Sequence, residues 1–186
     1  MVLVKRVLCI SMIALLAACG SGSGSNRAAL VDALASGLQK SSIDVKPSEA
    51  KCIAEDILNV VGVDTMKKIN DADPKGEHEA LKALGKNLST KQVGQVVDAL
   101  TSGKCMNFAA AIAANQKSSP PFNKMTVKQS TCFFTHFLDN PAVKAMMGQA
   151  MIGKSTDSSA LSDAFSNPAA AQKIFGDCGI SIDSLQ

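Results

Sequence analysis

The chain has 186 residues, of which 46% are hydrophobic, and its 19 basic and 16 acidic side chains give a formal net charge of +3. Proteins that bind nucleic acid usually carry a strong basic surplus on one face, so this near balance speaks against nucleic acid as a partner. Trp and Tyr are absent, and seven Phe are present. The composition therefore supplies few aromatic platforms on which sugars or bases could stack.

The N-terminal segment has the pattern of an export signal. Lys5 and Arg6 precede an apolar run over residues 7–18, which is too short to span a bilayer as a helix and has the length of a signal-peptide core. The run leads into Leu16-Ala17-Ala18-Cys19. Small side chains before the cysteine let an extended backbone enter a peptidase cleft, and the thiol of Cys19 is the group that a lipid donor can alkylate.

Residues 16–19 resemble the lipobox of bacterial lipoproteins. This resemblance implies that Cys19 is linked to diacylglycerol and that residues 1–18 are a signal peptide removed from the working protein. Residues 19–25 would then be the lipidated cysteine and a flexible Gly/Ser tether that holds the body close to the membrane. Two alternatives stay open: ordinary cleavage would release a soluble secreted protein, and an uncleaved segment would remain as an anchor.

The lipobox resemblance also implies a location. We expect a lipid-anchored protein at the cell membrane or the outer membrane, facing the periplasm or the exterior. Gly20 follows the lipidated cysteine. In bacteria with two membranes, the absence of Asp at that position implies passage to the outer membrane.

From residue 26 onward the apolar residues recur at helical spacing, and no stretch shows a convincing alternating strand pattern, so the expected fold is all-α. Start and stop signals divide the chain into helices. Ser89 with Gln92 and Thr126 with Gln129 form capping boxes, and Gly62 is a natural stop. The expected helices cover about 28–38, 48–61, 63–69, 77–87, 91–100, 105–115, 127–138, 141–153 and 168–176.

A repeat organises this helical region, residues 26–186. Gln-Lys-Ser-Ser occurs at 39–42 and again at 116–119, each time before a cysteine-bearing helix. The cysteine follows the glutamine after 13 residues in the first case and after 16 in the second. The shared order of helix, linker and cysteine indicates a duplication, with pseudo-repeats at about 27–103 and 104–180.

Four cysteines remain once Cys9 and Cys19 are set aside: Cys52, Cys105, Cys132 and Cys178. An even number in an exported domain predicts two disulfides, and a metal site is less favoured because the chain has no Cys-x-x-Cys pair and only two His. If each half closes on itself, the bonds are Cys52–Cys105 and Cys132–Cys178. The halves loosely resemble two-cysteine helical repeats of exported bacterial proteins of unknown role.

Residues 71–79 gather four carboxylates and one imidazole. As a calcium loop, Asp71, Asp73 and Gly76 would occupy positions one, three and six, but Lys75 and Lys82 stand where positions five and twelve need oxygen ligands. A solvated acidic turn is therefore favoured. A weak cation site that recruits Glu79 is the alternative.

His136 is the candidate catalytic base, because it follows Cys132 by four residues on the same helix face. A base needs an activated nucleophile, and the chain has no G-x-S-x-G motif and no free thiol once the predicted disulfides form. A structural histidine beside the core is therefore favoured. Met and Phe residues could line an apolar groove, but core filling is the commoner role for such residues; they are Met146, Met147, Met151, Phe133, Phe134 and Phe137.

The sequence thus predicts a lipid-anchored, all-α envelope protein that acts as a structural or protein-interaction module without a catalytic residue, metal or cofactor. Its expected partners are the membrane, through Cys19, and a protein of the envelope. Two alternatives remain: a carrier that holds a small apolar ligand in a Met/Phe-lined cavity, and a hydrolytic enzyme that uses His136 or the 71–79 loop.

Overall fold

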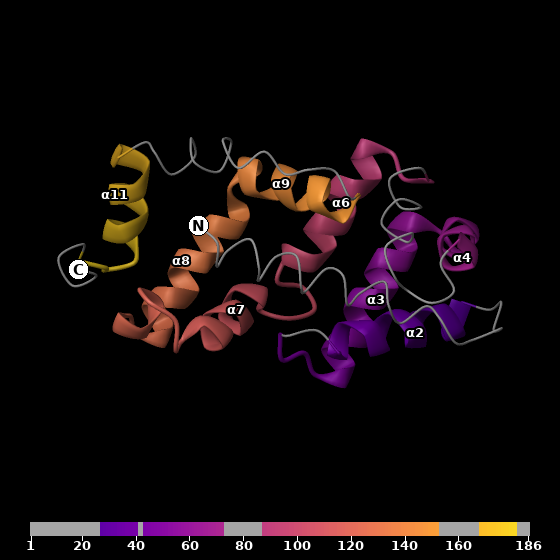
Figure 1. Ribbon diagram of the computed structural model, residues 1–186, viewed down its shortest axis with the longest axis horizontal. Coiled ribbons are helices and arrows are strands. Elements are labelled where there is room, and N and C mark those ends of the chain that lie inside the picture. The colour runs from indigo at the N-terminus through magenta and orange to yellow at the C-terminus, as the bar shows by residue number, and fades with distance from the viewer. Residues whose placement is uncertain (1–26, 41–42, 73–86, 153–167, 182–186) are drawn as a thin grey trace.

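The computed structural model describes residues 27–40, 43–72, 87–152 and 168–181, and this part of the chain is all-α, as predicted (Figure 1). The predicted signal peptide, Cys19, the tether and nearly all of the helix expected at 77–87 lie outside these ranges. The α-helices are α2 (Arg27–Gln39), α3 (Pro47–Val61), α4 (Val63–Ala72), α6 (Thr90–Thr101), α7 (Phe108–Gln116), α8 (Val127–Asp139), α9 (Pro141–Met151) and α11 (Pro168–Asp177), with a 3-10 turn η2 at Phe122–Lys124.

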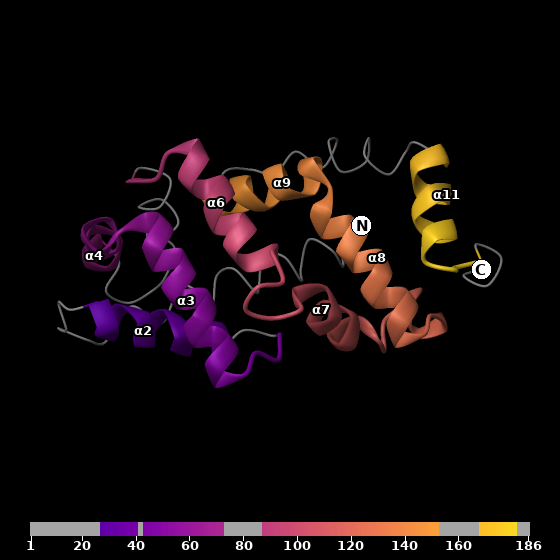
Figure 2. The same ribbon diagram turned by 180° about the vertical axis from the view of Figure 1, so that it is seen from behind.

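The helices form two similar halves. The first half contains α2, α3, α4 and α6 and ends at Cys105, and the second contains α7, α8, α9 and α11 and continues through Cys178. Corresponding helices make the same contacts in both halves. The α2–α3 contact corresponds to α7–α8, the α3–α4 contact to α8–α9, and the α3–α6 contact to α8–α11. Figures 1 and 2 show α2, α3 and α4 at one end of an elongated molecule and α11 at the other.

The two cysteine-bearing helices, α3 and α8, correspond residue by residue. Their N-caps, Lys46 and Thr126, are 80 positions apart, as are Cys52 and Cys132. The residue four positions after each cysteine is Asp56 in α3 and His136 in α8. Equivalent sites in the two halves can therefore be compared directly.

The helix starts follow the capping signals in the sequence. The Ser89 hydroxyl accepts from the Gln92 N–H at 3.3 Å, and the Gln92 side-chain oxygen accepts from the Ser89 N–H at 3.0 Å. Thr126 and Gln129 repeat this arrangement at the start of α8. These bonds satisfy backbone donors that have no partner within the helix.

Several predicted helix ends were wrong. The helix expected at 63–69 continues to Ala72, and the helix expected at 141–153 ends at Met151. The helix expected from Cys105 begins at Phe108, because the side chain of Asn107 accepts a hydrogen bond from the Ala110 N–H at 2.9 Å and caps the helix there. The stop expected at Gly176 comes later, since α11 runs to Asp177 and the left-handed residue is Gly179, at φ 63°. Reaching this conformation costs glycine less than any other residue.

One hydrophobic core runs through both halves. In the first half, Ala50 and Ala54 of α3 are fully buried, and these small side chains let α2 approach closely. The core continues through the inner faces of α6, α8 and α9, where Val96, Val97 and Val143 are at most 2% exposed. The two halves therefore share a core, which α6 and α9 join.

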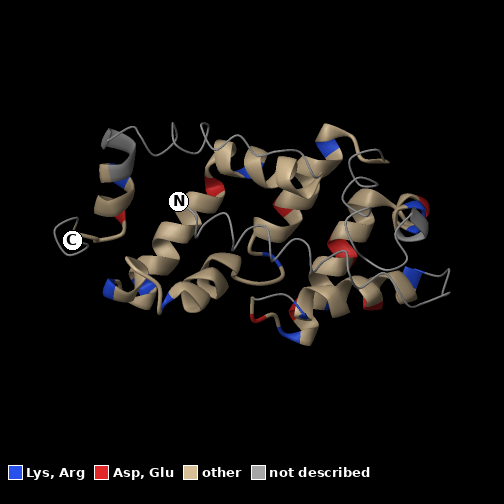
Figure 3. Cartoon of the chain, viewed as in Figure 1, with Lys and Arg blue, Asp and Glu red and all other residues tan. Residues whose placement is uncertain are grey.

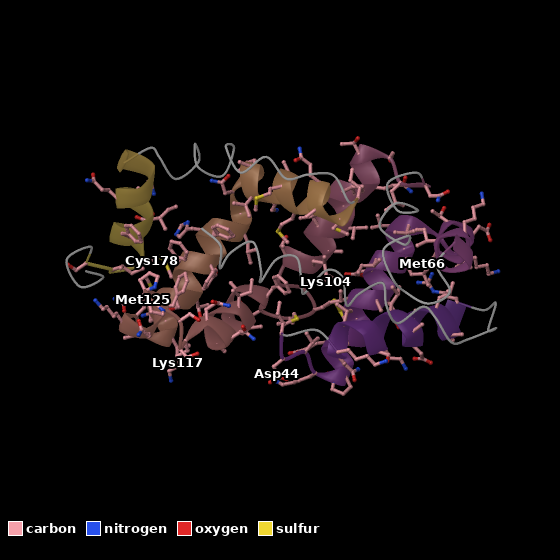
Figure 4. The ribbon with its side chains drawn as sticks, in the orientation of Figure 1. Asp44, Met66, Lys104, Lys117, Met125 and Cys178 are labelled. Atoms are coloured by element: carbon pink, nitrogen blue, oxygen red, sulfur yellow. A yellow bond between two sulfur atoms is a disulfide. The ribbon has the colours of Figure 1, made fainter. Side chains whose placement is uncertain are left out.

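A smaller cluster of buried residues, Met125, Cys178 and Ile180, lies beneath α11. Figure 4 shows Met125 and Cys178 close together. The end of α11 forms a Schellman motif, because the N–H of Ile180 donates to the Phe175 carbonyl at 2.8 Å and the N–H of Gly179 donates to that of Gly176 at 3.0 Å. The rings of Phe133 and Phe175 stack with centroids 6.0 Å apart. These contacts and one disulfide hold α11 on α8.

Basic and acidic residues are interspersed along both halves (Figure 3). Two of the surface ion pairs join neighbouring helices: Lys51 with Asp32 links α3 to α2 at 3.2 Å, and Lys144 with Asp98 links α9 to α6 at 2.8 Å. Within the described ranges, each helix is too short or too polar to cross a bilayer.

Candidate functional site

A groove of about 430 Å³ lies where α6 of the first half meets α9 of the second. Its floor is mostly apolar, and polar side chains lie along its length. The lining residues are Leu88, Thr90, Val93, Gly94 and Asp98 on the α6 side, and Lys144, Ala145, Gly148, Gln149 and Ile152 on the α9 side. Small binding sites in proteins are typically apolar hollows of about 300–1,000 Å³ with a few placed polar groups, and this groove falls in that range.

Two glycines shape the groove. Gly148 of α9 is buried, and a Cβ atom built there would lie 3.0 Å from Cγ1 of Val93 in α6, so the two helices approach closely because this side chain is missing. Gly94 of α6 is exposed, and a Cβ atom there would have no neighbour within 4 Å. One glycine thus lets the helices come together, and the other leaves the hollow open.

Four polar side chains line the groove, and two of them form an ion pair. The Lys144 ammonium donates to the Asp98 carboxylate at 2.8 Å and closes one side of the groove with an ion pair between the halves. What the groove offers is apolar surface, the Asp98–Lys144 pair and the side chains of Thr90 and Gln149.

The four predicted cysteines form two disulfides with the predicted pairing, Cys52–Cys105 and Cys132–Cys178. Both pairs have Cα atoms 5.5 Å apart, within the range of ordinary disulfides. Each bond joins the first turns of a central helix, α3 or α8, to the segment that follows the last helix of its half. The bonds therefore close loops with sequence separations of 53 and 46 residues.

The surroundings of the two disulfides differ in charge. Beside Cys52–Cys105, Lys104 (Figure 4) donates to both carboxylate oxygens of Asp56, at 2.7 and 2.8 Å. Asp56 also lies 3.8 Å from the sulfur of Cys105. In the second half, His136 occupies the position that corresponds to Asp56. The residue before the second cysteine is also different: it is Lys104 before Cys105 in the first half and Asp177 before Cys178 in the second.

His136 lies beside the second disulfide. Its ring nitrogen and the sulfurs of Cys132 and Cys178 lie within 4.8 Å of one another, and the two sulfurs are bonded to each other. Lys173 donates to the Asp177 carboxylate at 2.7 Å, and this bond lowers the pKa of Asp177. Partial desolvation opposes the shift, and the charges of Lys173 and His136 favour it.

The Met and Phe residues singled out in the sequence are mostly core residues. Met147, Met151, Phe134 and Phe137 are buried, and Met146 and Phe133 are half-buried. The aromatic rings pack on one another, with Phe122 and Phe134 centroids 5.0 Å apart. The groove between α6 and α9 is lined by other residues.

Most of the remaining predicted site residues lie outside the ranges that the structure describes. Cys19 is not among the described residues, and of the 71–79 loop only 71 and 72 are, as the last residues of α4. The groove was not predicted from the sequence. Gly94 and Gly148 lie in different helices, and no sequence pattern indicates that they line the same groove. Protein-family models, curated proteins and solved structures were all compared with this chain, and none matches it.

Proposed function

We propose that this protein is a bacterial lipoprotein, anchored in the cell envelope through Cys19, whose helical body is a non-catalytic module that binds another envelope protein. The observation that carries the proposal is the sequence Leu16-Ala17-Ala18-Cys19 after a charged start and an apolar run, with a Gly/Ser segment behind it. Two or more acyl chains hold a protein stably on a membrane, whereas a single acyl chain gives only marginal, reversible binding.

The two disulfides support this assignment. Disulfides form and persist in oxidising compartments outside the cytosol, and they are rare in cytosolic proteins. Both bonds of this chain lie inside its helical body, one in each half. A body stapled in this way suits the envelope, where an exported lipoprotein folds.

The groove between α6 and α9 supports the assignment of a binding role. We assign it to one or two apolar side chains of a protein partner, with Asp98, Lys144 and Gln149 available for hydrogen bonds at its edge. Gly94 lies open beside it, so a large side chain at that position would occupy the space meant for the partner.

The anchor is tested by growing cells with a clickable palmitate analogue. Wild-type protein should take up the label, and Cys19→Ser should lose it. Cys9→Ser, in the predicted signal peptide, is the matched control and should keep the label. An unlabelled wild type, or label that persists in Cys19→Ser, contradicts the proposal.

The binding role is tested with a photo-crosslinking amino acid in growing cells. Placed at Gln149 it should give a discrete crosslinked product that disappears in Gly94→Phe. Placed at the exposed Lys128 of α8 it should not give this product. The same product from both positions, or a product from 149 that Gly94→Phe leaves unchanged, would show that the groove does not bind the partner.

The volume and apolar floor of the groove also admit a small apolar ligand, which makes a carrier the second candidate. The two functions are separated by extracting the purified protein with organic solvent and analysing the extract by mass spectrometry. A small molecule recovered in stoichiometric amount from wild type, and not from Gly94→Phe, would favour the carrier.

A further inference from the structure

We propose that reduction of the Cys132–Cys178 disulfide opens a zinc site formed by Cys132, His136 and Cys178. The three ligand atoms come from two helical segments: Cys132 and His136 are four residues apart on α8, and Cys178 directly follows α11. Residues four apart share one face of a helix, which is the spacing at which paired histidines of zinc enzymes bind one ion.

The geometry already brings these atoms together. The two sulfurs and an imidazole nitrogen all lie within 4.8 Å of one another. Zinc bonds are about 2.3 Å to sulfur and about 2.0–2.1 Å to nitrogen, so ligand atoms of one site lie within about 4 Å of each other. Breaking the sulfur–sulfur bond lets the sulfurs move apart to that separation with a small shift of α11 on α8.

The imidazole of His136 is available to become a ligand. It lies at the surface, and the interaction that the structure describes for it with a charged side chain is the electrostatic attraction to the Asp177 carboxylate, not a hydrogen bond. Cys132 is half-buried and Cys178 buried beside it, so the sulfurs lie at the edge of the small core beneath α11 and the imidazole lies at the surface. An ion can therefore reach the site from solvent.

The equivalent place in the first half lacks this freedom. Asp56 occupies the position that corresponds to His136, and both of its oxygens accept from Lys104. A cation placed there would have to displace the ammonium group of Lys104. The two halves thus share the same arrangement of helices and disulfide, but the imidazole of His136 lies beside one disulfide and the Asp56–Lys104 ion pair beside the other.

The chemistry requires a reductant, which we take to be a dithiol. The dithiol gives two electrons to the sulfur–sulfur bond and closes to its own disulfide. Its two protons are transferred to the sulfurs of Cys132 and Cys178, which become thiols. Zn²⁺ then displaces one proton from each thiol and binds two thiolates and a neutral imidazole nitrogen. Three protein ligands leave the fourth tetrahedral position to water.

The test uses the full-length protein as purified from cells. One sample is oxidised and one is reduced with a water-soluble phosphine, because dithiols compete for zinc. Zinc affinity is measured by competition with a chromogenic chelator, for wild type, His136→Gln and the matched control Asp56→Asn. Each protein contains the same cysteines, so their thiols contribute equally to any background binding.

We expect reduced wild type and reduced Asp56→Asn to bind zinc alike, the oxidised protein not to bind it, and reduced His136→Gln to bind at least about tenfold more weakly. Equal affinity of reduced wild type and His136→Gln overturns the proposal, as does equal binding by oxidised and reduced wild type. Far-UV circular dichroism of the reduced protein with zinc provides the second measurement. Loss of the helical signal in zinc-loaded wild type would also overturn the proposal, because the site requires α8 and α11 to be folded.

Discussion

Replacing Gly148 with Ala tests the contact between the halves on which the groove depends. In a helix interior, Ala is favoured over Gly by about 0.8–1.0 kcal/mol. The new Cβ would lie 3.0 Å from Cγ1 of Val93, which is 6% exposed in the shared core. Overpacking of this kind costs about 1–3 kcal/mol. We therefore expect Gly148→Ala to be neutral or to lower the free energy of unfolding by up to about 2 kcal/mol.

Gly94→Ala is the matched control, because Gly94 also lies within a helix but a Cβ there meets no atom within 4 Å. It should gain the full propensity difference of about 0.8–1.0 kcal/mol. Urea unfolding followed by circular dichroism gives both free energies. Equal stabilisation by the two substitutions would refute the close approach of α6 and α9.

A third variant isolates the contact. Val93→Ala removes both γ-methyl groups of Val93, including the Cγ1 that meets the new Cβ of Gly148→Ala, at a cost of about 1.6 kcal/mol if each is worth about 0.8. In the Val93→Ala background, Gly148→Ala should become stabilising, by about the same amount as Gly94→Ala. The difference between the two backgrounds is the coupling energy of the contact.

Three further predictions concern a disulfide, a cap and a carboxylate. Replacing both Cys52 and Cys105 with Ala frees a loop whose ends are 53 residues apart and should lower the free energy of unfolding by about 4 kcal/mol in the chain-entropy model, measured by urea unfolding; an unchanged urea midpoint would contradict this. Thr126→Ala removes the N-cap of α8 and should cost about 1 kcal/mol in the same assay, whereas the neighbouring exposed Lys128→Ala should change little. Because the pKa of Asp177 is lowered in the folded protein, its pairing with Lys173 stabilises the fold above its ordinary value of 3.8, and this contribution disappears as the pH falls below that value. Asp177→Asn should therefore be less stable than wild type at neutral pH and equal to it in acid, and a difference that persists in acid would refute the assignment.

The fold was predictable where the sequence carries local signals. The capping boxes at Ser89 and Thr126 begin α6 and α8, and Gly62, at φ 84°, ends α3 as expected. The disulfide pairing followed from the repeat, because two halves that each close on themselves leave one connectivity. Local chemistry thus fixed the starts of α6 and α8, and internal symmetry fixed the covalent links.

The groove could not be predicted, because it depends on tertiary contacts. The start of α7 was missed for a different reason: the Asn107 cap, which begins the helix at Phe108 and leaves Cys105 outside it, is a local signal that the prediction overlooked. The close approach of Gly148 to Val93 joins residues that are 55 positions apart. An exposed glycine and a buried glycine look identical in the sequence, although one opens the groove and the other brings its walls together.

The two disulfides also determine how the body would respond to a mechanical load. If the helical body were pulled between Arg27 and Ser181, tension would pass from Cys52 to Cys105 and from Cys132 to Cys178 through the two covalent bonds. The loops that these bonds close, with separations of 53 and 46 residues, would carry no tension and add no extension. Under this load the body would lengthen mainly through residues 27–52, which include α2, and residues 105–132, which include α7.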